Sequence, residues 1–267
     1  MKFTAVPALV SALLAAGPAL AGAGPLTPHR AVYDLSLAGG AGLSEDAPDM
    51  TGRMVYEFTG NACEGYTTNF RFVVASTGDD GSRSVTDLRT SNHEDADGAG
   101  FQFLSQTYTN QVLTEDVKGT AASADGKVTV ELGGGAKPVT FAGTTLFPTA
   151  HLLKVIEAAK GGASVVEQDV YDGSDGGGRA YRTTTLIGRE SRDAAPGPAA
   201  KIGPVRHWPV TVSYFDPTAT GDQTPEYTIA FQLWENGVST DMTMDYGDFA
   251  LAGRLMGYEA LPEDKCD

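Results

Sequence analysis

The sequence has few cysteines, tryptophans and histidines: two, two and four among 267 residues. Basic residues are also scarce, because 19 lysines and arginines stand against 34 aspartates and glutamates, for a formal net charge of −15 at pH 7. Nucleic-acid binding needs a basic surface that displaces counterions from phosphates, and an anionic membrane surface repels an acidic protein. The composition therefore argues against nucleic acids and anionic membranes as partners.

Long apolar runs are absent except near the N-terminus. There Lys2 precedes an apolar run at residues 5–16, and Ala19 and Ala21 are small residues at the two positions that a signal peptidase reads. We expect a signal peptide at residues 1–21, cleaved after Ala21, and a single domain at residues 22–267.

The same run also bears on membrane attachment. It is shorter than the roughly 20 apolar residues that span a bilayer, and no second run follows. We therefore predict no transmembrane segment in the mature chain. No cysteine follows the cleavage position to carry a lipid. The sequence thus predicts a free periplasmic protein.

The two cysteines are Cys63 and Cys266. Cysteines in an oxidising compartment usually pair, whereas a redox couple needs neighbouring cysteines such as Cys-x-x-Cys. A bridge here would enclose about 200 residues, and on the chain-entropy model a loop of that length stabilises a fold by roughly 5 kcal/mol. The sequence therefore predicts a structural disulfide that ties the early part of the fold to the C-terminus.

Apolar and polar residues alternate along most of the chain, which is typical of strands with one face on a core. The apolar members of the clearest sets are Tyr33, Leu35 and Leu37; Met54, Tyr56 and Phe58; Phe70, Phe72 and Val74; Val128, Val130 and Leu132; Val210, Val212 and Tyr214; Tyr227, Ile229, Phe231 and Leu233; and Met242, Met244 and Tyr246. Asn236 and Gly237 suit a two-residue hairpin turn, which predicts that the strands of Tyr227 and Met242 pair. The predicted fold is mainly β, with a large antiparallel sheet.

One segment has helical spacing instead. Residues 150–160 carry an apolar stripe at intervals of three and four, with Thr149 as the expected N-cap and two glycines after the last turn. A second short helix is expected at residues 249–256, although Gly253 weakens it. We also expect three exposed loops, at residues 39–49, 172–178 and 193–203.

The sequence contains no recognisable catalytic constellation. A Gly-x-Ser-x-Gly elbow is absent, and we interpret His151 and His207 as capping and packing residues. Residues 93–97 and the set Asp169, Asp172 and Asp175 are rich in acids, but neither has the spacing of an EF-hand loop or a zinc site. We therefore predict no enzyme, no cofactor and no metal-ligand set, and the sequence leaves open whether the acidic loops bind Ca²⁺.

Binding by shape is the remaining class of function. A curved antiparallel sheet with one helix against it leaves an apolar cavity or an unpaired edge. Aromatic residues that would line such a cavity are Phe101, Phe103, Tyr108, Trp208, Tyr214 and Trp234. Each of these residues also fits an ordinary core.

A set of motifs, taken in order, resembles the EipB-like cell envelope integrity family of alphaproteobacteria. The motifs are His29-Arg30-Ala31-Val32-Tyr33-Asp34-Leu35, Asn61-Ala62-Cys63-Glu64-Gly65-Tyr66, Phe147-Pro148-Thr149-Ala150-His151, Tyr214-Phe215, and Asp245-Tyr246-Gly247-Asp248-Phe249 with a cysteine near the C-terminus. The resemblance covers nearly the whole mature chain. No single motif carries it alone.

The resemblance implies a periplasmic protein without known enzymatic activity that serves envelope maintenance and stress resistance. It implies an incompletely closed β-barrel, or β-spiral, with one amphipathic helix in its inner wall, similar to periplasmic lipoprotein carriers. The family's cysteine pair falls on Cys63 and Cys266, which we interpret as the clasp of this open barrel. Its expected partners are periplasmic tetratricopeptide-repeat proteins.

Three functional hypotheses follow. The first is a non-enzymatic envelope-integrity factor that binds a periplasmic protein through its sheet edge or cavity mouth. The second is a carrier of a lipid or acyl chain in an apolar barrel interior. The third and weakest is an envelope-directed hydrolase, which would need two carboxylates with separated pKa values in one pocket.

Overall fold

A computed structural model describes residues 26–39, 49–78, 80–263 and 266. The predicted signal peptide, its cleavage after Ala21 and most of the expected loop at residues 39–49 lie outside these residues. No helix in the described ranges is long and apolar enough to cross a membrane. The strands are β1 (His29–Leu37), β2 (Asp49–Asn61), β3 (Gly65–Thr77), β4 (Arg83–Glu94), β5 (Gly100–Thr109), β6 (Val112–Ala124), β7 (Lys127–Leu132), β8 (Val139–Ala142), β9 (Val165–Val170), β10 (Tyr181–Ile187), β11 (His207–Phe215), β12 (Tyr227–Trp234), β13 (Ser239–Asp245) and β14 (Ala250–Ala260). The helices are α1 (Pro148–Lys160) and the short 3₁₀ turns η1 (Gly133–Gly135), η2 (Asp175–Gly177) and η3 (Gly197–Ile202).

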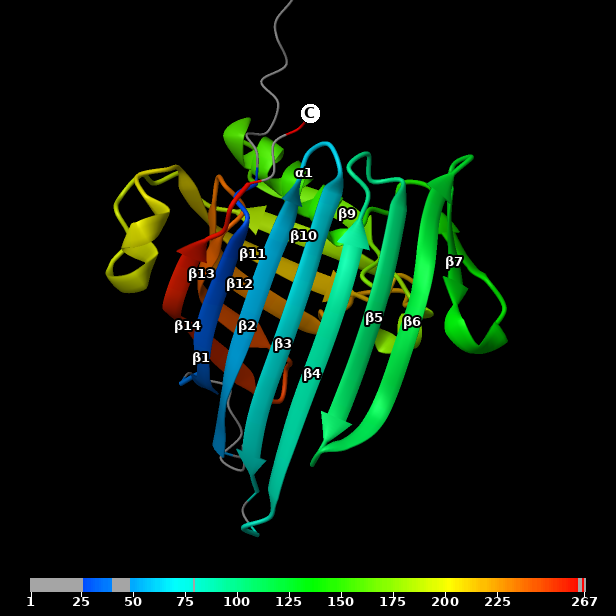
Figure 1. The fold of residues 1–267 in the computed structure, drawn as a ribbon, viewed down its shortest axis with the longest axis horizontal. Helices are drawn as coiled ribbons and strands as arrows, with labels where there is room; N and C mark the ends of the chain where they lie inside the picture. Colours follow the sequence, from blue (N-terminus) through cyan, green and yellow to red (C-terminus); the bar gives the residue numbers. More distant parts are fainter. Residues whose placement is uncertain (1–25, 40–48, 79, 264–265, 267) are drawn as a thin grey trace, which may run out of the picture.

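All these strands belong to one 14-stranded antiparallel sheet in the order β8-β7-β6-β5-β4-β3-β2-β1-β14-β13-β12-β11-β10-β9. The first and last strands pair in its middle, and β8 and β9 are its two edges. Figure 1 shows β1 to β6 side by side in one layer, with the strands from β10 to β13 running behind them at an angle. The predicted mainly β, incompletely closed barrel is confirmed.

The strand register explains which side chains meet inside. Tyr33 lies opposite Met54, Met54 opposite Phe72, and Phe72 opposite Leu88, so one inner-facing row crosses four strands. Cross-strand partners share a face of the sheet, while their sequence neighbours point to the other face. Arg53 next to Met54 accordingly reaches the outer face, where it donates to Asp34. The two-residue alternation in the sequence therefore positions the core correctly.

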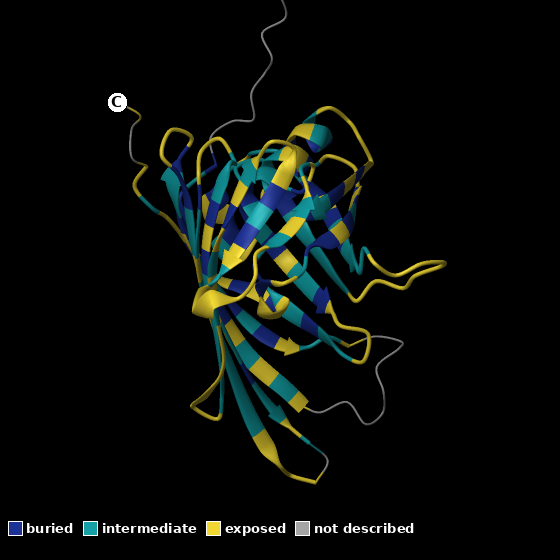
Figure 2. Ribbon diagram, turned by 90° about the vertical axis from the view of Figure 1, so that its right-hand side faces the viewer, coloured by how far each residue is buried: buried dark blue, intermediate teal, exposed yellow. Residues whose placement is uncertain are grey.

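Helix α1 fills one end of the space between the two layers. Val155, Ile156 and Ala159 are buried in one cluster with Trp208 and Leu233 of the back layer. The same cluster includes Phe58 and Tyr66 of the front layer. Figure 2 shows buried residues gathered near the helix, whereas the far ends of the long strands are less covered. The helix is thus part of the inner wall.

The start of α1 differs from the prediction. Its N-cap is Phe147, not Thr149, and Pro148 occupies the first turn, where a missing N–H costs nothing. The N–H groups of Thr149 and Ala150 donate to the Glu94 carboxylate at 2.7 and 2.8 Å. A buried carboxylate from β4 therefore replaces the local cap, and burial raises the pKa of this Glu94 carboxyl.

The expected second helix at residues 249–256 is wrong. This segment belongs to β14, which pairs with β1 on one side and β13 on the other. The pairing with β1 shifts register between Val32 and Tyr33, whose partners Gly257 and Leu255 are separated by the extra residue Met256. Leu251 and Leu255 share one face of β14 with Gly253 between them, and the bulge brings Tyr258 to that face three residues after Leu255. Spacings of four and three residues imitate a helix.

The loop predictions at residues 172–178 and 193–203 are right in position, and each loop is exposed in part and buried in part. Residues 193–203 contain η3, in which Ala199 and Ile202 are buried against the core cluster of β14. Residues 172–178 contain η2, and Gly177 there is buried next to Leu132. Both segments cover the sheet rather than standing free of it. The predicted pairing of β12 with β13 is confirmed. The turn is longer than the predicted two residues, because Trp234 bonds to Val238 across three residues, of which Gly237 has a positive φ.

The structure contains the predicted disulfide. Cys63 lies in the turn between β2 and β3, and Cys266 follows β14, with their Cα atoms 5.8 Å apart. The buried Asn61 side chain accepts from the N–H groups of Cys63 and Glu64 at 2.8 and 2.9 Å and so fixes the turn. Because β2 and β14 flank β1, the bridge spans the middle of the sheet. It does not clasp the open edges β8 and β9, so that interpretation is wrong.

Candidate binding site

An apolar patch of half-buried side chains lies on the inner face of the sheet. We call it the inner apolar patch: Phe70, Phe72, Leu88, Ile229, Phe231 and Met242. These residues share the inner face because they pair with buried residues, such as Met54 opposite Phe72 and Val212 opposite Ile229. A side chain that packs against neighbours on all sides is fully buried, whereas these six side chains are only half-buried. The two layers therefore do not close over this patch.

Two hollows adjoin the interior of the open barrel. One of about 130 Å³ lies between α1 and the front layer, with Tyr56, Phe58 and Phe101 in its wall. Another of about 330 Å³ lies between the inner face of β4 to β6 and the loop at residues 172–176. Small-molecule sites commonly measure about 300–1,000 Å³, so only the second hollow reaches that size.

Tyrosine side chains from β10, β11 and β12 form a tyrosine cluster. The rings of Tyr214 and Tyr227 stack at 4.2 Å between centroids, and Tyr181 meets both edge-on. Asp172 lies close by and accepts from the N–H and hydroxyl of Ser174 at 2.9 and 2.6 Å. Burial raises the pKa of the Asp172 carboxyl and of both stacked phenols. Tyr214 and Tyr227 are therefore neutral at physiological pH.

The six aromatic residues proposed as cavity lining separate into three groups. Phe101 and Phe103 line the two hollows, and Tyr214 belongs to the tyrosine cluster. Trp208 and Trp234 are 2% and 1% exposed and serve as core. Tyr108 lies instead under the Arg89 guanidinium, 4.6 Å from it, on the outer face. The lining prediction therefore holds for Phe101 and Phe103, two of the six.

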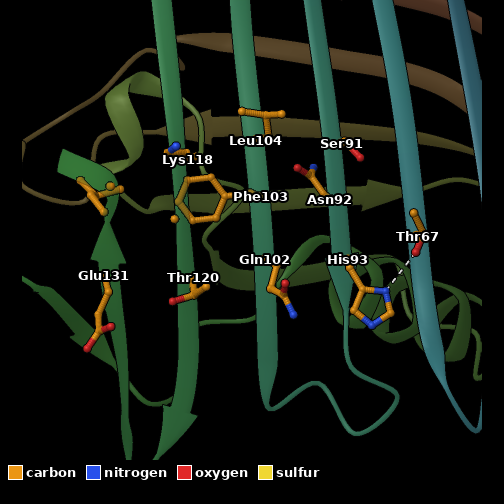
Figure 3. A pocket seen from close by; sticks show the side chains of 13 residues that line it. Thr67, Ser91, Asn92, His93, Gln102, Phe103, Leu104, Lys118, Thr120 and Glu131 are labelled. Carbon is orange, nitrogen blue, oxygen red and sulfur yellow. Dashed lines mark hydrogen bonds between the residues drawn. The ribbon is translucent and has the colours of Figure 1, made fainter.

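The outer face of β3 to β7 carries a polar trough of about 570 Å³. Figure 3 shows its central row, in which each residue lies opposite the next on neighbouring strands: Thr67, His93, Gln102, Thr120 and Glu131. Thr67 Oγ1 and His93 Nδ1 are 3.0 Å apart, but His93 Nε2 is 3.7 Å from Asp95 Oδ1. The distance of 3.7 Å is longer than a hydrogen bond. The Thr67 hydroxyl, the His93 imidazole and the Asp95 carboxylate therefore do not form an oriented catalytic chain.

The other candidate residues have structural neighbours of their own. His151 is buried in α1, with Nε2 3.5 Å from the Thr183 hydroxyl, and burial lowers its pKa to about 4. His207 stacks on Trp234 at 4.2 Å. These contacts agree with packing roles.

The second acidic set, Asp169, Asp172 and Asp175, does not act as one group, because each carboxylate has a different partner. Asp169 pairs with Arg182 at 3.4 Å, whereas Asp175 pairs with Arg179 and Asp172 contacts Ser174. In the part of the chain that the structure describes, no group of three or more His, Cys, Asp or Glu is placed to hold a metal ion.

The two sheet edges are the feature that the sequence does not reveal. The place of β9 at an edge depends on the order of the whole sheet, which no local pattern in the sequence shows. Beyond its pairing with β10, β9 has an isolated parallel bridge from Leu146 to Val170. Val165 and Leu186 lie opposite each other beside this edge and are 50% and 52% exposed. An exposed apolar pair beside a free edge is typical of a site that binds protein.

Comparisons with known proteins cover almost the whole chain. The family model described as EipB-like matches residues 20–262. The chain is 40% identical over 235 residues to the cell envelope integrity protein EipB of Brucella abortus (strain 2308), covering 86% of this chain and 83% of the relative. A crystal structure of a beta-barrel-like protein of domain of unknown function DUF1849 from Brucella abortus is similar, with a TM-score of 0.80 and 39% identity over 89% of this chain and 99% of the other. The similarity therefore extends over the whole sheet.

Proposed function

This chain belongs to the EipB-like family, and from that premise we propose that it helps to maintain the cell envelope from the periplasm by binding a protein partner. Its relative in Brucella abortus is named for cell envelope integrity. The N-terminal apolar run supports export. Binding without catalysis fits a site made of an edge and apolar surfaces rather than an oriented set of reactive groups.

The observation that carries the proposal is the open sheet. Edge strands present unpaired N–H and C=O groups, which pair readily with another chain unless they are covered. Here the edges β8 and β9 remain at the ends of the sheet order, with exposed Val165 and Leu186 beside β9. Tetratricopeptide-repeat proteins, which the family resemblance implies as partners, present extended concave surfaces suited to binding protein segments.

Cross-linking followed by affinity purification of the tagged full chain from its native periplasm tests the proposal. We expect one protein to co-purify in a fixed ratio, and the tag alone exported by the same signal peptide is the control. A tagged chain that restores envelope integrity to a strain lacking the gene, yet retains no protein in repeated cross-linked purifications, would overturn partner binding.

A second candidate function, carriage of a lipid or acyl chain, is favoured by the inner apolar patch. Mass spectrometry of an organic extract from natively purified protein would reveal such cargo. Phe72→Gln changes the inner face, whereas the matched control Val73→Gln changes the next residue on β3, which points outward. A carrier would yield stoichiometric lipid that the first variant loses and the second retains; repeated absence of lipid from the wild type would exclude it.

A further inference from the structure

The hydrogen-bond pattern identifies which groups of β9 are free. Ile187 donates its N–H to the Ser164 carbonyl at 2.9 Å, so Ile187 and Ser164 form a hydrogen-bonded pair. In an antiparallel ladder such pairs recur at every second residue of each strand. Val166, Gln168 and Val170 therefore bond to β10. The N–H and C=O groups of Val165, Glu167 and Asp169 point away from β10, toward the edge.

Part of this edge is already occupied by the chain itself. Leu146 donates to the Asp169 carbonyl at 2.9 Å and accepts from the Tyr171 N–H at 2.9 Å. Among the described residues no backbone hydrogen bond reaches the edge-facing N–H and C=O groups of Val165 and Glu167 or the N–H of Asp169. Leu146 thus makes an isolated bridge at the C-terminal end of β9 and leaves the N-terminal half of this edge without a neighbouring strand.

The side chains beside the free half define the chemistry of a complementary strand. Val165, Glu167 and Asp169 share one face, and Leu186 lies opposite Val165 on the same face. Asp169 pairs with Arg182, whereas Glu167 is exposed and has no ion pair among the described residues. A strand added at this edge would place its own side chains about 5 Å from these groups.

We propose that the free edge at Val165 and Glu167 binds an extended segment of the partner, with an apolar residue beside Val165 and Leu186 and a lysine or arginine beside Glu167. This inference rests on the proposed function and assigns its surface. The net charge of −15 favours a cationic segment. Antiparallel pairing of two copies centred on this edge would bring Glu167 against Glu167, and like charges directly opposite destabilise a sheet. The occupant is therefore a different chain.

The substitution Glu167→Pro tests the edge directly. Proline removes an N–H that points outward and leaves the bonds to β10 in place, as proline on edge strands normally does. Glu167→Ala is the matched control, because it removes the carboxylate and keeps the N–H. The probe is acetyl-Thr-Val-Thr-Lys-Thr-Val-Thr-amide, which places lysine opposite Glu167 in either strand direction, and the same peptide with glutamate in place of lysine is its counterpart.

We expect the lysine peptide to slow hydrogen exchange at the amides of Val165, Glu167 and Asp169 in the wild-type chain. We expect fluorescence anisotropy to give at least tenfold weaker binding for Glu167→Pro than for Glu167→Ala, and weaker binding of the glutamate peptide to the wild type. Circular dichroism and thermal melting confirm folding of each variant. If Glu167→Pro does not fold, Val165→Lys, which leaves the backbone intact, should weaken binding of the lysine peptide instead.

Equal affinity of the proline and alanine variants, protection at another surface, or dimerisation that Glu167→Pro abolishes would each overturn the inference. The native purification separates it from the proposed function. A partner retained equally by wild type and Glu167→Pro would contradict this edge and leave partner binding intact. A peptide-binding edge with no partner in the periplasm would contradict the proposed function and leave the edge chemistry intact.

Discussion

His151 is a buried titratable side chain in a helix that joins the two layers. The residue is 7% exposed, its ring faces the Thr183 hydroxyl, and Lys154 lies one turn further along α1. Burial is the main reason that its pKa falls from 6.5 to about 4, and the positive charge of Lys154 adds to the effect. The imidazole is therefore neutral in the folded chain at the pH of most assays.

This pKa predicts a loss of stability in mild acid. Between pH 6.5 and pH 4 the unfolded chain binds a proton at His151 that the folded chain does not, so the free energy of unfolding falls as the pH falls. The full shift corresponds to about 3 kcal/mol. Chemical unfolding at several pH values should show a shallower decline for His151→Gln than for the wild type across this window. Parallel curves for the two proteins would contradict the prediction.

At the scale of elements, the hairpin between β12 and β13 depends on a close approach as well as on a turn. Gly237 has φ of 87°, in the left-handed region that favours glycine. A Cβ there would lie 2.8 Å from Cδ2 of Leu26, a residue that is 2% exposed. Leu26 in turn belongs to the cluster around α1. The turn thus packs onto the segment that precedes β1.

Gly237→Ala and Gly126→Ala form a matched pair for this contact. Gly126 also has a positive φ, 72°, but nothing lies within 4 Å of its Cβ position. Both substitutions should cost about 1 kcal/mol for the left-handed backbone. Gly237→Ala should cost at least about 1 kcal/mol more, because the buried Leu26 must move. Denaturant unfolding measures both, and equal costs would show that Leu26 adapts freely.

The sequence predicts elements well where the determining contacts are local. Alternation predicts strands such as β2 and β12, and Asn236-Gly237 predicts the hairpin, because both depend on neighbouring residues. The cap of α1 is missed because its acceptor, Glu94, is 55 residues away from Thr149. The identity of β14 is missed for a similar reason, since its bulge exists only opposite β1.

The candidate site is less predictable than the fold. Val165 and Glu167 carry no motif, and their importance comes from the position of β9 at the end of the sheet order. The aromatic residues that stand out in the sequence, Trp208 and Trp234, are core instead. Burial follows from apolar character along one strand, whereas an open edge depends on where every other strand lies. The sequence therefore predicts the core more readily than the binding surface.

At the scale of the whole molecule, the disulfide acts on a sheet whose first and last strands along the chain already pair. β1 pairs with β14 from His29 opposite Ala260 to Leu37 opposite Leu251, so backbone hydrogen bonds hold the two ends of the chain together. The bridge closes a loop with a sequence separation of 203 around this pairing. Its effect should therefore fall mainly on the unfolded chain, whose conformational freedom it restricts.

Replacing both Cys63 and Cys266 by serine should lower the free energy of unfolding by up to about 5 kcal/mol, the value that the chain-entropy model gives for so long a loop. The far-UV circular dichroism and the hydrogen-exchange protection of β14 should stay unchanged, because the β1–β14 pairing remains. Reduced wild-type protein is the control and should unfold like the double variant. Equal free energies of unfolding for the oxidised and reduced proteins would show that the disulfide does not stabilise the fold. A loss of β14 protection in the variant would instead mean that the bridge maintains the folded sheet as well as restricting the unfolded chain.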